Sequence, residues 1–183
     1  VWLRTREDDA VEVKFGGEVR EWMDNGRFKV AQVGYNSVIA VPHDMFISGY
    51  DSDAANRLIL WSAKLPQSFD MAAFSRGDYV RALEQNTMAE TISKVLYPAD
   101  DHIQGKRLRL KQQYLLVSAS LQSILKRHFK KYHTFDNLAD KVAIHINDTH
   151  PALCVPELVR LLIDEHDYGW DQAWEITCNT LSY

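Results

Sequence analysis

Cysteines are scarce in this 183-residue sequence, and long apolar runs are missing. The two cysteines, Cys154 and Cys178, lie in predicted helices without metal-ligand spacing, so we expect reduced core residues of a cytoplasmic protein. No apolar run approaches the roughly 20 residues that cross a bilayer, and no secretory signal opens the chain. The sequence therefore predicts no membrane partner.

An excess of positive charge is also missing, because 25 acidic residues face 21 basic ones, for a net charge of -4. This balance gives no reason to expect a nucleic acid partner. Hydrophobic residues make up 46% of the chain, which is enough for the core of one compact domain, or of one domain with a small lobe.

Several motifs with well-understood chemistry are absent. The seven histidines show no HExxH spacing, and Asp51 to Asp53 lack the glycine and distal glutamate of a calcium loop, so we predict no metal site. There is no dinucleotide-binding or P-loop glycine pattern and no GxSxG nucleophile elbow. The chain opens on Val1 without methionine and stops at Tyr183, so we expect an internal fragment of a longer protein, although a processed chain would look the same.

The first portion, residues 1–63, is predicted to consist mainly of antiparallel strands. Residues 11–15 alternate between apolar and charged side chains, which is typical of a half-buried strand. Asp24-Asn25-Gly26 predicts a hairpin turn, because Asn and Gly tolerate positive φ. A short strand over 38–41 is expected to end at Pro42, and residues 57–61 form another.

The second portion, residues 64–183, is predicted to be mostly helical. Asp78 would cap a helix that contains Met88 and ends before Pro98. A long helix follows, and apolar residues recur along it at helical spacing: Leu110, Tyr114, Val117, Leu121, Ile124 and Phe129.

The last part is predicted to be a strand–helix–helix unit, with a strand over 142–146 and helices over 156–166 and 170–181. Its final helix carries a predicted buried stripe of Trp170, Ala173, Trp174, Thr177 and Leu181. The predicted fold is therefore mixed α/β, in which strands are followed by helices and by part of an α/β sheet whose other strands lie outside this chain.

Four polar residues follow the predicted strand over 142–146: Asn147, Asp148, Thr149 and His150. Ligands of open α/β sheets bind beyond the carboxyl ends of strands, and these side chains could orient the hydroxyl groups of a polar ligand. Alternatively, Asp148 or Thr149 only caps the next helix, and Asn147 shapes the turn. The chemistry of the residues leaves both interpretations open.

A second polar loop contains Asp100, Asp101 and His102. Two carboxylates that are forced together can share one proton, which raises one pKa. They can equally be solvated charges at the start of a helix. Nothing local distinguishes the two interpretations.

From about Gly34 onward the sequence resembles the glycogen phosphorylases, and most closely the bacterial α-glucan phosphorylases. Five ordered blocks carry the resemblance: RLILWSAK (57–64), VLYPADD (95–101), GKRLRLKQQYLLVSASLQSILKRH (105–128), DKVAIHINDTHPALCVPELVRLLIDE (140–165) and WDQAWEIT (170–177).

The resemblance implies an enzyme that uses inorganic phosphate to release glucose 1-phosphate from the ends of glycogen or maltodextrin, with pyridoxal phosphate as its cofactor. The parent would be a cytoplasmic homodimer of GT-B type, with its active site between two Rossmann-like domains. This chain would be part of the N-terminal domain. The cofactor lysine would lie in the other domain, so we expect no bound pyridoxal phosphate, no complete catalytic set and no activity in this fragment.

Residue by residue, the resemblance places Asp148 and His150 beside the glucose pocket and matches Asp100 and Asp101 to a loop that covers it. Lys126 and Arg127 fall where the animal enzymes have two arginines for a nucleotide activator, so we expect nucleotide activation to be weak or absent. Two other functions stay open, namely a free-standing carbohydrate-binding module and a structural or dimerisation lobe.

Overall fold

The computed structural model describes residues 2–66 and 89–183, so the predicted cap Asp78 and Met88 lie outside the described residues. The fold is mixed α/β, as predicted, with antiparallel sheets and several helices. The chain divides into two compact units: Val1–Lys14 with Ser37–Leu115, and Phe15–Asn36 with Leu116–Tyr183. We describe each unit by itself. In the described part of the chain, no helix is both long and apolar enough to span a bilayer.

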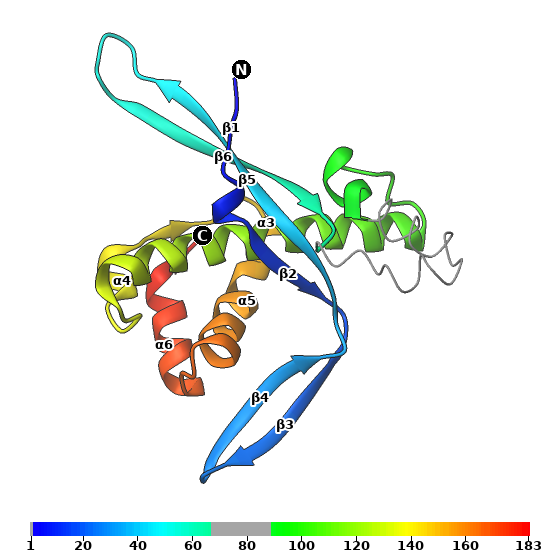
Figure 1. Ribbon diagram of the computed structural model, residues 1–183, viewed down its shortest axis with the longest axis vertical. Helices are drawn as coiled ribbons and strands as arrows, with labels where there is room; N and C mark the ends of the chain where they lie inside the picture. Colours follow the sequence, from blue (N-terminus) through cyan, green and yellow to red (C-terminus); the bar gives the residue numbers. More distant parts are fainter. Residues whose placement is uncertain (1, 67–88) are drawn as a thin grey trace. The chain divides into compact units, whose positions relative to one another are not determined.

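The first unit is built on a four-stranded sheet (Figure 1). Its central strand β5 pairs antiparallel with β6 from Ile39↔Lys64 to Ser48↔Ala55, and with β1 at Arg4↔Asp44 and Thr5↔His43. β2 neighbours β5, and a 3₁₀ turn, η1, separates β1 from β2. The elements are β1 (Arg4–Thr5), η1 (Glu7–Asp9), β2 (Val11–Phe15), β5 (Asn36–Ser48) and β6 (Ala55–Lys64).

We predicted that Pro42 ends its strand, and this prediction is wrong. β5 continues for six residues beyond Pro42. Its carbonyl accepts a 3.0 Å hydrogen bond from the backbone N–H of Arg6, where the chain leaves β1 for η1. In an antiparallel strand the N–H and C=O of one residue point to the same side. The missing N–H of Pro42 therefore faces the place where the neighbouring strand has ended, and the ladder loses little.

The hairpin of β3 (Glu18–Asp24) and β4 (Arg27–Val33) belongs to the second unit (Figure 1). Asn25 and Gly26 form its turn with φ of 49° and 79°, as the sequence predicts. Lys29 on β4 forms an ion pair with Asp167, and this contact ties the hairpin to the loop before the last helix.

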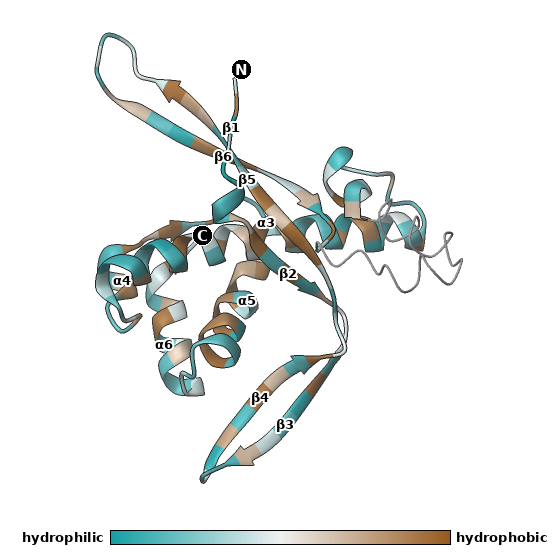
Figure 2. Cartoon of the chain, viewed as in Figure 1, coloured by the Kyte–Doolittle hydropathy of each residue, from teal (hydrophilic) through white to brown (hydrophobic). Residues whose placement is uncertain are grey.

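Helices and one pair of short strands make up the rest of the second unit, to which α3 belongs from Leu116 onward. The long helix α3 is confirmed and runs farther than predicted, from Ile103 to Tyr132. Its last four turns pack with the later helices around a core of Val117, Leu121, Leu125, Phe135, Leu138, Leu158, Leu162 and Ile176. The other elements are α4 (Leu138–Lys141), η2 (His150–Leu153), α5 (Cys154–Arg160), the π-helical η3 (Leu161–Glu165) and α6 (Trp170–Thr180). Figure 2 shows the apolar residues of α5 and η3 in brown.

Several residues that we predicted to be buried are exposed. Trp170 and Trp174 are 63% and 45% exposed, and their rings lie parallel at a centroid distance of 6.3 Å. Ala173 and Thr177 of the predicted stripe are buried, as expected, and Ile176 lies with them on the buried side of α6. Leu110, Phe129 and Cys178 are also exposed. Helical spacing gives the direction of an apolar stripe but not its edges, and these residues lie at the edges.

The strand predicted over 142–146 is reduced to β7 (Ile144–His145), which pairs in parallel with β8 (Leu181–Ser182). The register is Ile144↔Leu181 and His145↔Ser182. α5 and α6 lie between the two strands in the sequence and connect them, as a parallel pair requires. Leu181, which we predicted to be the end of the last helix, is the first residue of β8.

Candidate functional site

The polar segment 147–150 lies at the carboxyl end of β7. The backbone N–H of Ile146 donates a 2.8 Å hydrogen bond to the carbonyl of Ser182, and His145 Nδ1 lies 3.1 Å from the Ser182 hydroxyl. Because the two strands are parallel, their carboxyl ends reach the same edge of the sheet. Segment 147–150 and Tyr183 therefore both leave the sheet at this edge.

Asp148 has an unusual backbone conformation at this edge, with φ of 76°. Few residue types other than glycine adopt positive φ, and Asp and Asn are among the more tolerant because their short polar side chains bond locally. The Asp148 carboxylate accepts hydrogen bonds from the backbone N–H of Thr149 and from the Thr149 hydroxyl, the latter at 3.1 Å. An aspartate at position 148 therefore suits the backbone conformation of this turn, and it also provides a carboxylate that can accept hydrogen bonds.

The structure brings Asp148 and His150 together on an exposed surface. His150 Nδ1 lies 3.9 Å from Asp148 Oδ1, and the two side chains are 44% and 64% exposed. A carboxylate accepts hydrogen bonds, and an imidazole can donate or accept them, so the pair offers complementary partners to hydroxyl groups. Neither side chain is enclosed by apolar neighbours.

The capping alternative for this segment is not supported, because η2 has no side-chain capping hydrogen bond. Thr149 is the N-cap residue of η2, and its side chain makes no capping hydrogen bond. Asp148 binds the amide of Thr149, one residue before the helix begins, and Pro151 occupies the first turn. Asp148 thus supports the turn, while most of its side chain stays in contact with solvent.

The sequence analysis missed a buried ion pair on α5, between Glu157 and Arg160. Glu157 on α5 is buried, and its carboxylate accepts a 2.6 Å hydrogen bond from the Ser118 hydroxyl on α3. Arg160 donates to the same carboxylate through Nε at 2.8 Å and Nη2 at 2.9 Å. This network joins α5 to α3 and so fixes the helix that follows segment 147–150. The only signal in the sequence was a Glu and an Arg three residues apart within an apolar helix.

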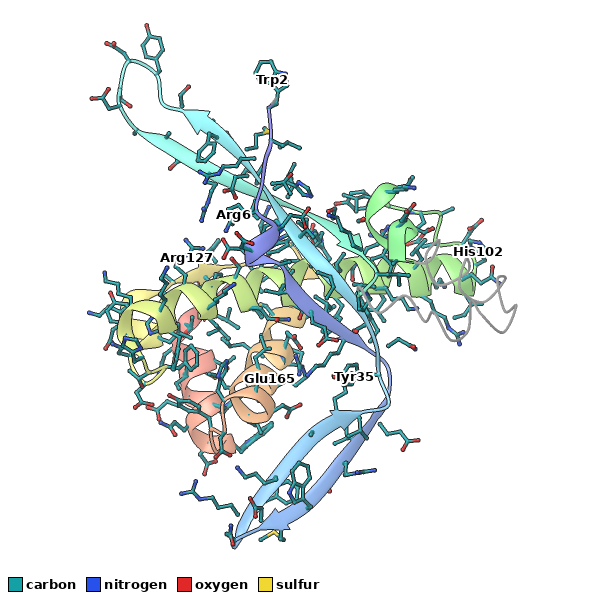
Figure 3. All side chains as sticks on the ribbon, viewed as in Figure 1. Trp2, Arg6, Tyr35, His102, Arg127 and Glu165 are labelled. Carbon is teal, nitrogen blue, oxygen red and sulfur yellow. The ribbon has the colours of Figure 1, made fainter. Side chains whose placement is uncertain are left out.

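The other predicted site residues lie in the first unit, in the loop before α3 (Figure 3 labels His102). Asp100 forms an ion pair with Arg109, and Asp101 Oδ1 lies 3.4 Å from His102 Nδ1. Each carboxylate therefore has a basic partner of its own, and both are exposed. This arrangement corresponds to the second interpretation of the loop, charged groups in solvent at the start of a helix.

Metal chemistry finds no support among residues 2–66 and 89–183, where no group of three or more His, Cys, Asp and Glu side chains could hold an ion. Lys126 and Arg127 are exposed near the end of α3, and Figure 3 labels Arg127. Burial raises the pKa of the Cys154 thiol, so this cysteine is a poor nucleophile.

A parallel strand pair joined by helices, with an exposed carboxylate and an exposed imidazole beyond its carboxyl edge, defines a protein of the mixed α/β class. The family can be named: a carbohydrate phosphorylase model matches residues 1–183, so the chain belongs to the carbohydrate phosphorylase family. The resemblance drawn from the sequence is thereby confirmed.

Among curated proteins the chain is similar to glycogen phosphorylases. It is 46% identical over 182 residues to that of Pasteurella multocida, 43% over 188 residues to that of Haemophilus influenzae, and 42% over 191 residues to the human brain form. Each match covers 100% of this chain and 22% of the relative. The chain thus spans about a fifth of the length of these proteins.

Proposed function

We propose that this chain forms part of the sugar-binding wall of a glycogen phosphorylase, an enzyme that transfers terminal α-1,4-linked glucose from a glucan to inorganic phosphate. The observation that carries the proposal is the exposed Asp148–His150 pair at the carboxyl edge of β7 and β8, in a chain of the carbohydrate phosphorylase family. In this proposal, the pair contacts hydroxyl groups of the glucose unit, and each buried hydroxyl needs such a partner.

The roles follow from the chemistry of each group. Asp148 accepts a hydrogen bond from a sugar hydroxyl. The exposed ring of His150 donates a hydrogen bond to a second hydroxyl or accepts one from it. Neither residue acts as a nucleophile in this proposal, so both position the substrate. Asp100 and Asp101 also contact the sugar in the proposal, and this assignment rests on the resemblance of their loop to the family's loop over the glucose pocket.

Pyridoxal phosphate, which the family implies, does not fit the residues of this chain. A lysine that forms a Schiff base needs an enclosed amine of lowered pKa. All ten lysines of the chain lie among the described residues, and none of them is buried. We therefore propose that another part of the parent enzyme holds the cofactor.

The architecture of the parent is part of the proposal as well. A parallel strand pair with helical connections is what a Rossmann-like sheet of a GT-B enzyme contains, and β7 with β8 supplies two such strands. We further propose a cytoplasmic homodimer. Because half of a cleft does not exclude water, the 183-residue chain alone should be inactive.

The test is the release of glucose 1-phosphate from maltooligosaccharide by a phosphorylase that contains this chain. Asp148→Asn keeps the tolerance of positive φ and an acceptor oxygen but removes the charge, and it should lower kcat/KM about tenfold, because a hydrogen bond to a neutral acceptor is weaker than one to a carboxylate. The matched control is Asp140→Asn, at an exposed position of α4 in the same unit. Equal kcat/KM for the two variants would refute the role of Asp148, and no release by the unaltered enzyme would refute the function.

Calorimetry separates the remaining alternatives. The 183-residue chain should bind maltooligosaccharide weakly at most, because the proposal gives it one wall of the site. Tight binding without cofactor would instead favour a carbohydrate-binding module. An assembly state that changes with Asp148→Asn, without any effect on activity in the parent, would favour a structural or dimerisation lobe.

A further inference from the structure

The loop over 95–102 lies unusually close to the first turns of α3, and Gly105 makes this possible. A Cβ at position 105 would stand 1.8 Å from the carbonyl oxygen of Ala99 and 2.9 Å from the His102 ring. No side chain fits at such distances, and Gly105 is buried in a helix, where glycine is otherwise unfavourable. The sequence therefore gives up helix stability so that the loop backbone can rest on α3.

Two side chains of α3 and one backbone hydrogen bond hold the loop in this position. Gln112, which is 4% exposed, donates a 2.7 Å hydrogen bond to the carbonyl of Val95. Arg109 forms an ion pair with Asp100, and its guanidinium carbon lies 5.9 Å from the centre of the Tyr97 ring. The backbone N–H of Lys106 donates to the carbonyl of His102 at 3.1 Å.

Positions 105, 109 and 112 form one face of α3, because residues three and four apart lie on the same side of a helix. Tyr97 has φ of 58°, a conformation that is rare for a bulky residue and that persists only where the surroundings hold it. The contact with Arg109 supplies part of that support. The loop is thus shaped by α3 and not by its own sequence alone.

We propose that Arg109 is a positioning residue for Asp100: it orients the Asp100 carboxylate and holds the loop over 95–102 against α3. The functional meaning rests on the proposed function, in which Asp100 contacts the sugar. An arginine suits this task because its planar fork bonds a carboxylate in a fixed direction and also stacks on an aromatic ring. A lysine keeps the charge but provides neither feature.

The two kinds of contact differ in strength. Gln112 and Gly105 are buried, so their contacts with the base of the loop are shielded from water. The side chains of Arg109 and Asp100 are 40% and 50% exposed, and such pairs are weak and are screened by salt. The Arg109 contact is therefore the one that salt or a substitution can weaken without disturbing the buried base of the loop.

Amide hydrogen exchange on the 183-residue chain tests the contact without any assumption about activity. Arg109→Ala should speed exchange at residues 99–102 roughly two- to fivefold, as expected for the loss of one exposed ion pair. Asp100→Ala should do the same, and the double variant should show no further increase. Arg107→Ala, at an exposed base of the same helix, is the control and should change nothing. Unchanged exchange in Arg109→Ala would overturn the proposal.

Kinetics in the parent phosphorylase tests the positioning role. Arg109→Ala should raise KM for maltooligosaccharide with an unchanged midpoint of thermal unfolding, and Arg109→Lys should restore KM only in part. A residue with a merely structural role would lower the unfolding midpoint and leave KM unaltered, and that result would overturn the positioning role. Faster exchange in the isolated chain, together with a parent that shows no phosphorolysis, would refute the proposed function but keep the loop contact.

Discussion

The hydroxyl of Ser118 donates a 2.6 Å hydrogen bond to the carboxylate of Glu157, and both residues are buried in the second unit. The same carboxylate binds Arg160 through two nitrogens. A buried charge needs such complete pairing, because an unpaired one would be strongly destabilising. The network joins α3 to α5. In the sequence, α5 begins four residues after His150, the last of the proposed sugar-binding residues.

Glu157→Ala should lower the free energy of unfolding by about 2–4 kcal/mol, because it leaves Arg160 and Ser118 without their main partner. Arg160 keeps Asp164 and Glu165 within reach, so the loss should fall below that of a completely isolated charge. Urea unfolding of the 183-residue chain measures the change. Glu175→Ala, at an exposed position of α6, is the control, and a similar small effect of both changes would contradict the account.

Gly105→Ala should disturb the loop over 95–102 although alanine is the better helix former. In an open helix the change would stabilise by about 1 kcal/mol. Here the new Cβ meets the carbonyl of Ala99, so the loop must move away, and amide exchange at residues 99–102 should rise. Gly169→Ala is the matched control, because nothing lies within 4 Å of the position that its new methyl group would take, and exchange nearby should stay the same. Unaltered amide exchange in Gly105→Ala would contradict the prediction, because it would show that a methyl group fits between α3 and the loop.

Stability should depend on pH through His166. Burial lowers the pKa of this imidazole, and Glu165 opposes that effect. The unfolded chain then binds the proton first, so the contribution of His166 is complete above its ordinary pKa of about 6.5 and is lost as the pH falls toward the lowered value. The urea midpoint should therefore drop less between pH 7.5 and pH 5.5 in His166→Gln than in the original chain. An identical drop in both would contradict this assignment.

Local chemistry made some elements predictable from sequence. The turn at Asn25 and Gly26 requires two positive φ values, and few other residue pairs adopt them readily. These two residues are therefore enough to predict the β3–β4 hairpin. The existence of α3, although not its full length, follows from a sustained helical period. The segment 147–150 was found because four polar residues follow an apolar strand, which is also a local pattern.

Contacts between distant segments account for what could not be predicted. Pro42 is tolerated inside β5 because of where β1 ends, and no local pattern contains that information. The two-residue length of β7 depends on its pairing with β8, which lies 37 residues away in register. Glu157 and Arg160 would fit equally well as an exposed pair on a helix surface, and only the packing of α5 against Ser118 on α3 shows that the carboxylate is buried.

The central claim, that Asp148 accepts a hydrogen bond from a sugar hydroxyl, is tested most directly by combining a variant enzyme with altered substrates. The measurement is kcat/KM for the parent phosphorylase and for Asp148→Asn, each with maltooligosaccharides whose terminal glucose lacks one hydroxyl at a time. The account predicts one deoxy sugar for which the roughly tenfold difference between the two enzymes disappears, because the partner of Asp148 has been removed. The same ratio for every deoxy sugar would contradict it.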